Sequence, residues 1–106
     1  MTNEFGVKLD SNGYAPSVIE PYDTGACYLC GFRGDLVRHE VFHGPNRQKS
    51  KALGCWVHLC PRCHGELHSR RPEWDWQLRR IGQIRVMAEY EWSTDDFRRR
   101  FGKSYV

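Results

Sequence analysis

The sequence has no long hydrophobic run, and no stretch of it approaches the roughly 18 apolar residues that a membrane-spanning helix needs. Its first residues, MTNEFGVKLDSNG, contain neither a basic start nor an apolar segment, so no secretory signal peptide is visible. These absences argue against a membrane partner and favour the cytoplasm, where thiols stay reduced. The 5 cysteines therefore indicate metal ligation rather than disulfides, and the odd count fits four ligands with one spare residue.

Repeats, low-complexity tracts and interdomain linkers are also missing, and a chain of 106 residues suits one domain, residues 1–106. The formal net charge of +3 decides little by itself, but the charge is unevenly distributed. Residues 1–37 carry 2 basic and 5 acidic side chains, whereas the residues from Arg38 onward carry 14 basic and 8 acidic ones. This asymmetry suits a phosphate-bearing partner, although a solvated surface explains any single lysine or arginine equally well.

Two pairs of extended segments are expected in the first half of the chain. Residues 4–19 form the first pair around a turn at Asn12 and Gly13, which gives an N-terminal hairpin or arm over residues 1–22. The segments of the second pair flank a polar, basic loop, and apolar and polar residues alternate along the first of them. Its strands are residues 36–42 and 55–59, and the loop is residues 43–54.

Helices are expected in the second half, where residues 71–106 form a C-terminal extension. A short helix opens after the second cysteine pair, at residues 64–70. A longer one follows over residues 71–90, with Pro72 in its first turn and apolar residues at three- and four-residue spacing, namely Trp74, Leu78, Ile81, Ile84 and Met87. The last helix covers residues 93–102, with Ser93 or Thr94 as its cap and Gly102 as its stop.

Two C-x-x-C pairs indicate a first metal ion. Cys27 with Cys30, and Cys60 with Cys63, each offer two thiolates, and two such pairs complete the tetrahedral shell of a zinc ion. Four thiolates leave no open position for a substrate, so this zinc is expected to be structural. Cys55 is left over and is expected to be a buried, apolar residue.

A second group of ligand-type residues indicates another ion. His64 and His68 are four residues apart, and on a helix these positions share one face. His39, on the first predicted strand, is the candidate for a third ligand, because an antiparallel hairpin brings it back beside the start of the helix. Three imidazoles around a divalent ion would leave positions open for phosphate and water.

The order of strand, loop, strand and helix, with a ligand-type residue on the first strand and H-x-x-x-H on the helix, resembles the HNH endonucleases. Small phage-encoded HNH proteins are similar in the runs HEVFHGPNR and LCPRCH, and more weakly in a tail with Phe101, Gly102 and Tyr105. The resemblance implies an α+β fold with a zinc-stapled ββα-metal core (HNH, or His-Me finger) over residues 27–70, an N-terminal hairpin and C-terminal helices. It also implies a metal-dependent endonuclease that hydrolyses DNA phosphodiester bonds.

Carried over residue by residue, the resemblance places His39 where the family has a metal-binding Asp or His. His64 falls on the last His of the motif, and His68 on the extra ligand of some members. The catalytic ion that these residues are expected to hold is Mg²⁺, Mn²⁺, Ni²⁺ or Zn²⁺. The general-base His of the family directly follows the first ligand, where this chain has Glu40, and the central Asn of the family coincides with Cys55.

Glu40 and His43 are the two candidates for the general base. Glu40 is preferred because it occupies the family position. His43 is the better base chemically, because an imidazole pKa near 6.5 lies closer to neutrality than a carboxylate pKa of about 4.3. The alternative interpretation of Glu40 is an ordinary residue on the surface of a strand.

Cations in the loop between the predicted strands are the candidate DNA contacts. Arg47 is preferred because its fork pairs with phosphate oxygens, and Lys49 and Lys51 are further candidates. Later arginines would extend this surface, namely Arg70, Arg71, Arg79, Arg80 and Arg98 to Arg100. No residue is suited to reading bases, so low sequence specificity is expected.

His58 and Trp56, on the second strand, are interpreted as packing residues. His58 is therefore not expected to be a metal ligand, and Trp56 is not expected to stack on bases.

Two other hypotheses stay open. A catalytically degenerate, zinc-bound module derived from an HNH fold, which binds nucleic acid or protein, is favoured by Glu40 and Cys55. The three histidines favour the enzyme, because a zinc knuckle needs no further ligands. A redox protein that uses C-x-x-C is the third hypothesis, and the sequence lacks the βαβ pattern expected around such a motif. A phage-encoded enzyme would act in the cytoplasm of a bacterial host. Its partner would be DNA, and it would also form a homodimer or bind a phage protein.

Overall fold

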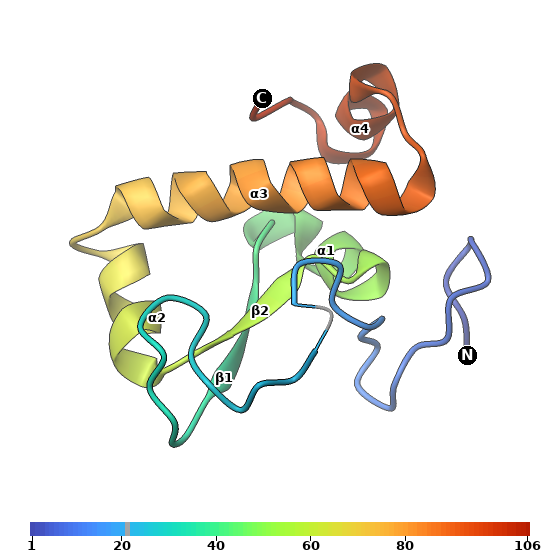
Figure 1. Cartoon of the computed structure of the whole chain (residues 1–106). Helices are drawn as coiled ribbons and strands as arrows, with labels where there is room; N and C mark the ends of the chain where they lie inside the picture. The colour runs from blue at the N-terminus through green and yellow to red at the C-terminus, as the bar shows by residue number, and fades with distance from the viewer. Residues whose placement is uncertain (21) are drawn as a thin grey trace.

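Two short antiparallel strands form the sheet of the computed structural model, which describes residues 1–20 and 22–106. β1 (Val37–Glu40) pairs with β2 (Trp56–Leu59), and their register sets His39 opposite Val57. Both strands lie within the predicted ranges but are shorter. The described part of the chain adds four α-helices to this sheet, so the fold is α+β, as the sequence predicts (Figure 1).

The connection between the strands contains a helix, so the prediction of a loop there is wrong over most of its length. A 3-10 turn (Gly44–Asn46) leads into α1 (Arg47–Leu53), whose sequence RQKSKAL consists mainly of good helix formers. Gly54 ends α1 in the left-handed conformation, with a φ of 84°. Because α1 buries only Ser50 and Leu53, its polar sequence shows no apolar periodicity.

The helix α2 (Pro61–His68) begins inside the second cysteine pair, three residues before the predicted start. Pro61 occupies the first position of the helix, where a missing N–H is harmless. Cys60 is the N-cap, and its sulfur accepts a hydrogen bond from the backbone N–H of Cys63 at 3.4 Å. The second C-x-x-C pair therefore forms the N-cap and first turn of α2.

The last two helices, α3 (Pro72–Tyr90) and α4 (Thr94–Phe101), confirm the predicted elements. α4 begins with a capping box, in which Ser93 and Asp96 each accept a hydrogen bond from the other's backbone N–H. Figure 1 shows α3 running across the molecule, with the sheet, α1 and α2 on one side and α4 with the C-terminus on the other.

One face of α3 is buried against the segment that follows β1. A Cβ atom added at Gly82 would lie 3.1 Å from the side chain of Val41, so the glycine permits a close approach of helix and strand end. The same buried face includes Leu78 and Val86. Ile84, predicted to belong to the apolar face, is 50% exposed, because it lies on the opposite side of the helix from Gly82 and Val86.

The N-terminal segment does not form the predicted hairpin of strands. Within residues 1–20 the β-like pairing is a single bridge between Thr2 and Lys8. The predicted turn is present, since Asp10 accepts hydrogen bonds from the N–H groups of Asn12 and Tyr14. Pro21, part of the predicted arm, lies outside the described residues.

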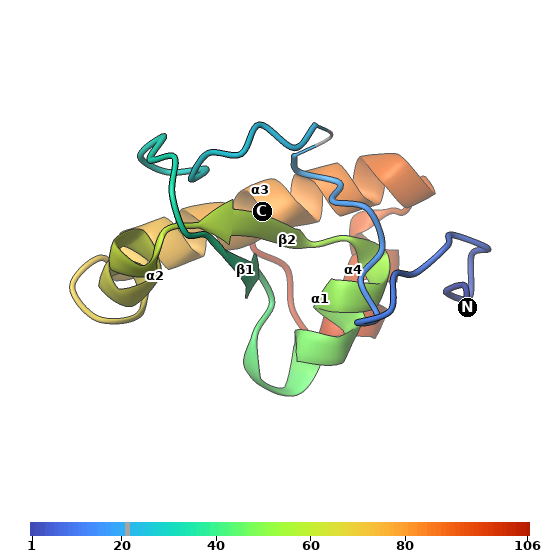
Figure 2. The ribbon, with the colours of Figure 1, turned by 90° about the horizontal axis from the view of Figure 1, so that it is seen from below.

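Instead of pairing with itself, this segment bonds to the end of α1, beside which it lies in Figure 2. The N–H groups of Ala15 and Val18 donate to the carbonyl oxygens of Lys51 and Gly54, at 3.0 and 2.9 Å. These bonds use backbone donors that a hairpin ladder would need.

Aromatic side chains hold the C-terminal tail against the end of β1. The ring of Phe42 lies 4.7 Å from that of Phe101 and 5.7 Å from that of Tyr105, measured between centroids. Phe97 stacks on Phe101 at 4.6 Å. The core therefore extends from the sheet to α4 and anchors the tail.

In the part of the chain that the structure describes, no helix combines the length and apolar character needed to cross a bilayer.

Candidate metal centres

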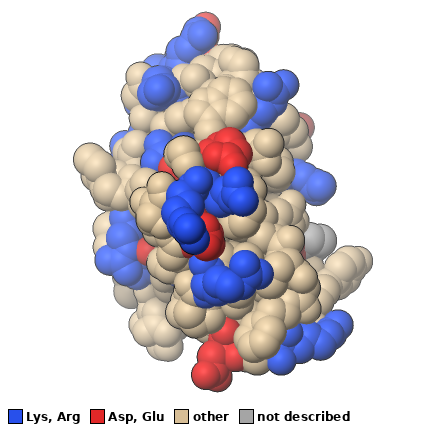
Figure 3. All heavy atoms as spheres, turned by 90° about the vertical axis from the view of Figure 1, so that its left-hand side faces the viewer, with Lys and Arg blue, Asp and Glu red and all other residues tan. Residues whose placement is uncertain are grey.

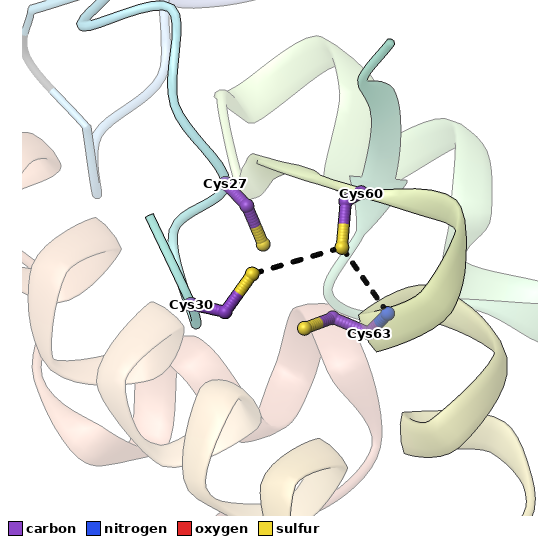
Figure 4. A group of neighbouring side chains, drawn as sticks. All are labelled: Cys27, Cys30, Cys60 and Cys63. Carbon is purple, nitrogen blue, oxygen red and sulfur yellow. Dashed lines mark hydrogen bonds between the residues drawn. The ribbon is translucent and has the colours of Figure 1, made fainter. Parts of the chain in front are cut away.

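Four cysteine sulfurs converge between the loop before β1 and the start of α2 (Figure 4). The Sγ atoms of Cys27, Cys30, Cys60 and Cys63 all lie within 4.8 Å of one another, and those of Cys30 and Cys60 are 3.8 Å apart. A tetrahedron with Zn–S bonds of about 2.3 Å has edges of about 3.8 Å, so the spacing fits a zinc ion. The four cysteines are positioned to hold a metal ion, as the sequence predicts.

The backbone around Cys27 is shaped to present its sulfur. Gly31, with a φ of 79°, lets the chain turn back so that its N–H donates to the carbonyl oxygen of Cys27 at 2.9 Å. Burial opposes ionisation of the Cys27 thiol, but the nearby backbone N–H groups of Cys60, Cys30 and Leu29 favour the thiolate and lower the pKa of the thiol to about 7. A thiolate that forms readily near neutral pH is the form that binds a metal.

Cys55 lies apart from this cluster, as predicted. It is fully buried just before β2, and burial raises the pKa of its thiol well above the usual range. The residue therefore behaves as a small apolar side chain.

A second group of ligand-type atoms is formed by His39 from β1 and by His64 and His68 from α2. One ring nitrogen from each residue lies within 4.8 Å of the other two. The ring centroids are 5.3 Å apart for His39 and His64, 5.4 Å for His39 and His68, and 4.8 Å for His64 and His68. The one-turn spacing on α2 and the antiparallel register of the hairpin produce this arrangement together.

The environment of His39 suits a neutral metal ligand. Its side chain is 2% exposed, and its Nε2 atom is buried without a hydrogen-bond partner. Burial, and next the neighbouring His64 and His68, lower its pKa to about 4, so the imidazole is neutral over the physiological range. A buried nitrogen without a partner is unfavourable, and a bound cation would satisfy it.

His43 lies beside these three histidines and contacts α3. Its ring centroid is 5.0 Å from that of His68 and 5.9 Å from that of His39. Its Nε2 atom is 3.0 Å from Oδ1 of Asp75 and 2.8 Å from a terminal nitrogen of Arg79. The partner of this nitrogen depends on the tautomer of the ring. A protonated Nε2 donates to Asp75, whereas an unprotonated Nε2 accepts from Arg79.

Asp75 is the site residue that sequence reasoning missed, and Arg79, expected only as part of a DNA-binding surface, instead contacts His43. They are one turn apart on α3, and Nε of Arg79 lies 3.4 Å from Oδ2 of Asp75. Arg79 also donates to the hydroxyl oxygen of Tyr105 at 3.0 Å. The sequence signal is only an acid and a base at i and i+4, which is typical of a solvated helix face.

Glu40 points away from the histidines. Successive side chains on a strand alternate between faces, so Glu40 and its neighbour His39 lie on opposite sides of β1. The Glu40 carboxylate accepts hydrogen bonds from Tyr14 Oη at 2.7 Å and from Arg47 Nε at 2.6 Å. Burial raises the pKa of this carboxyl, but the bonds from Arg47 and Tyr14 outweigh burial and hold the pKa below its usual value. Glu40 has the environment of a structural ion pair.

The three cations predicted to contact DNA each make a contact within the protein. Arg47 pairs with Glu40, and the side-chain nitrogen of Lys51 lies 4.8 Å from the ring centroid of Tyr14. Lys49 donates to the carbonyl oxygen of Arg100, where its charge is favourable at the C-terminal end of α4. Binding of DNA by these residues stays a prediction.

Trp56 and His58 agree with their interpretation as packing residues. Trp56 is buried, and its indole N–H donates to the carbonyl oxygen of Ala15 at 2.8 Å. The ring of His58 packs against that of Trp56 with centroids 5.0 Å apart, and its backbone N–H donates to Glu20.

Basic and acidic side chains are interleaved on the face formed by α2 and its turn into α3 (Figure 3). A cavity of about 390 Å³ lies there, lined by Arg62, Glu66, Arg70, Arg71 and Trp74. Nη1 of Arg70 is 3.6 Å from Oε1 of Glu66, so part of the positive charge is balanced. This face is less cationic than its arginines alone suggest.

Comparison of the chain with protein-family models, curated proteins and solved structures gives no match. The two centres therefore have to be interpreted from their own geometry.

Proposed function

We propose that this protein is a zinc-stabilised, metal-dependent endonuclease of the HNH type, which hydrolyses DNA phosphodiester bonds with little sequence specificity. The observation that carries the proposal is the group of His39, His64 and His68, whose ring nitrogens converge from β1 and α2. The resemblance of the sequence to HNH proteins agrees with it, although the resemblance rests partly on the same three histidines.

The four cysteines have a structural role in this proposal. Thiolates occupying all four positions of a zinc ion leave none for a substrate. Because Cys60 is the N-cap of α2, a zinc ion there would fix the start of the helix that carries His64 and His68. The cysteine centre would thus set the geometry of the histidine centre.

The three histidines would hold the second divalent ion, and His39 suits this role because its buried Nε2 has no other partner. When bound, such an ion polarises a phosphate and stabilises charge on the leaving oxygen. Imidazole nitrogens are ligands for several of the divalent ions considered, so the histidines do not select one of them.

His43, rather than Glu40, is the general base of the proposal. His43 lies next to His68, whereas Glu40 is on the other face of β1 and engaged by Tyr14 and Arg47. With its Nε2–H donated to Asp75, His43 keeps Nδ1 free to take a proton from an attacking water. Asp75 holds the ring in that tautomer and stabilises the imidazolium that forms.

The second candidate function is a degenerate nucleic-acid- or protein-binding module. It is favoured by Glu40, which occupies the family's base position and serves as an ion-pair partner of Arg47. A module of this kind would keep the cysteine centre without cleaving DNA.

Plasmid nicking in the presence of Mg²⁺, Mn²⁺ or Ni²⁺ tests the proposal. We expect nicking with at least one ion, and a loss of more than about a hundredfold in His64→Ala, because one of three ligands is removed. His58→Ala is the matched control, since His58 lies outside the cluster. His64→Ala should keep its zinc and its melting transition. Absence of nicking by the wild-type protein with every ion would favour the binding module.

A further inference from the structure

The cysteine centre is open to solvent on one side. Cys30 is exposed, whereas Cys27, Cys60 and Cys63 are 3, 4 and 1% exposed. A cavity of about 300 Å³ reaches the centre from this side, and its walls are Cys30, Phe32, Cys60, Pro61 and Arg62. A small molecule in this cavity would meet two of the four sulfurs.

The same cavity places a cation and a second sulfur next to Cys30. The guanidinium of Arg62 lies beside the cluster, with Nη2 4.0 Å from Sγ of Cys63. Sγ of Cys60 lies 3.8 Å from Sγ of Cys30, so a movement of less than about 2 Å would bring the two sulfurs to bonding distance. Cys55 lacks all of these features, because it is fully buried and outside the cluster.

We propose that Cys30 is a reactive site for hydroperoxides, and that its oxidation forms a Cys30–Cys60 disulfide that releases the zinc ion. The Cys30 thiolate attacks the peroxide, the O–O bond breaks, and a sulfenic acid and one hydroxide form. The Cys60 thiolate then attacks that sulfur and displaces a second hydroxide. Two thiolates lose two electrons in total, the peroxide gains two, and zinc stays divalent. Arg62 stabilises the departing hydroxide.

The disulfide would also affect α2. The sulfur of Cys60 is the N-cap acceptor for Cys63, and this hydrogen bond depends on the present position of the sulfur. Loss of zinc and of the cap would destabilise the whole fold, including the helix start that precedes His64. Control of the histidine centre by oxidation rests on the proposed function, but the chemistry at Cys30 does not.

The test uses the full-length, zinc-loaded protein and hydrogen peroxide. Released zinc is followed with a chromophoric chelator, and disulfides are mapped by mass spectrometry. We expect one zinc released per chain, a Cys30–Cys60 disulfide, an unmodified Cys55, and recovery with a dithiol and zinc. Cys30→His keeps a zinc ligand but removes the reactive sulfur, so we expect release to slow by about tenfold or more. Arg62→Gln should slow it by a smaller factor.

Any of three results would overturn the proposal: zinc retained under peroxide, a disulfide that excludes Cys30, or release from Cys30→His as fast as from the wild type. If Cys30→His fails to bind zinc, the mapped disulfide and the Arg62→Gln rate decide the question. Zinc release without nicking activity in any preparation would support the chemistry at Cys30 and contradict the proposed function.

Discussion

Oδ1 of Asp75 lies 3.0 Å from Nε2 of His43, and this contact joins α3 to the segment after β1 beside the three converging histidines. Both side chains are partly buried, with 21 and 34% of their surfaces exposed. A carboxylate in this position fixes the orientation and tautomer of the ring. The contact therefore makes Asp75 a positioning residue for the proposed base.

Asp75→Asn should lower the rate of DNA nicking without unfolding the protein. The amide keeps the size of the side chain but loses the charge that stabilises the protonated ring. General-base catalysis is worth about a hundredfold to ten-thousandfold, and we expect the variant to lose at least about tenfold in kcat. Single-turnover nicking across a range of pH measures the effect. Asp95→Asn, at an exposed position on α4, is the control and should nick at the wild-type rate.

The two candidate bases make opposite predictions. His43→Ala should lower kcat by about a hundredfold or more, because His43 lies beside His68 and is the histidine of this group that the proposed function does not use as a metal ligand. Glu40→Gln should keep most of the activity but lose about 1–3 kcal/mol of the free energy of unfolding, because charge-assisted bonds to Arg47 and Tyr14 are weakened.

Urea unfolding and plasmid nicking, measured on both variants, separate these effects. A Glu40→Gln protein that is stable and inactive would return the role of base to Glu40. An active His43→Ala protein would remove the His43–Asp75 pair from the mechanism.

Local spacing was enough to predict both clusters of ligand-type residues. The C-x-x-C pairs and H-x-x-x-H specify which atoms share a loop or a helix face, and the hairpin needs only two strands to bring His39 to His64. The contact of His43 with Asp75 joins residues 32 positions apart and depends on how α3 crosses the sheet. No periodicity in the sequence encodes that crossing.

The errors have a related cause. The α1 helix was hidden because it packs with only two buried residues, and helical periodicity appears only where a broad face is buried. The N-terminal hairpin was predicted from its turn, but the flanking backbone bonds to α1 instead. In the N-terminal segment tertiary contacts overrode the local pattern, whereas α1 follows helix propensities that a search for apolar periodicity does not detect. Glu40 was preferred as the base by family position, which carries no information about the face on which a side chain lies.

Gly54→Ala should destabilise the protein strongly. Gly54 has a φ of 84°, and a Cβ atom there would lie 2.2 Å from the carbonyl oxygen of Pro16. We expect a loss of more than about 2 kcal/mol, because backbone strain and a steric clash add together. Gly65→Ala is the matched control. Gly65 lies inside α2 with nothing within 4 Å of an added Cβ, so this change should stabilise the fold by about 0.5–1 kcal/mol. Equal melting temperatures for the two variants would contradict the packing of the N-terminal segment on α1.

Cys27→Ser should abolish folding, whereas Cys55→Ala should not. Cys27 supplies one of four converging sulfurs, and a site that forms together with the fold cannot lose a ligand without losing stability. Cys55 is buried but outside the cluster, so its truncation should cost about 1 kcal/mol and leave the zinc content unchanged. Circular dichroism melts with zinc quantified by atomic emission measure both variants. Prolonged treatment of the wild-type protein with a strong chelator should reproduce the Cys27→Ser result, and added zinc should reverse it. If the Cys27→Ser protein melts like the wild type, the four cysteines do not hold a structural ion and α2 is fixed by its N-cap alone.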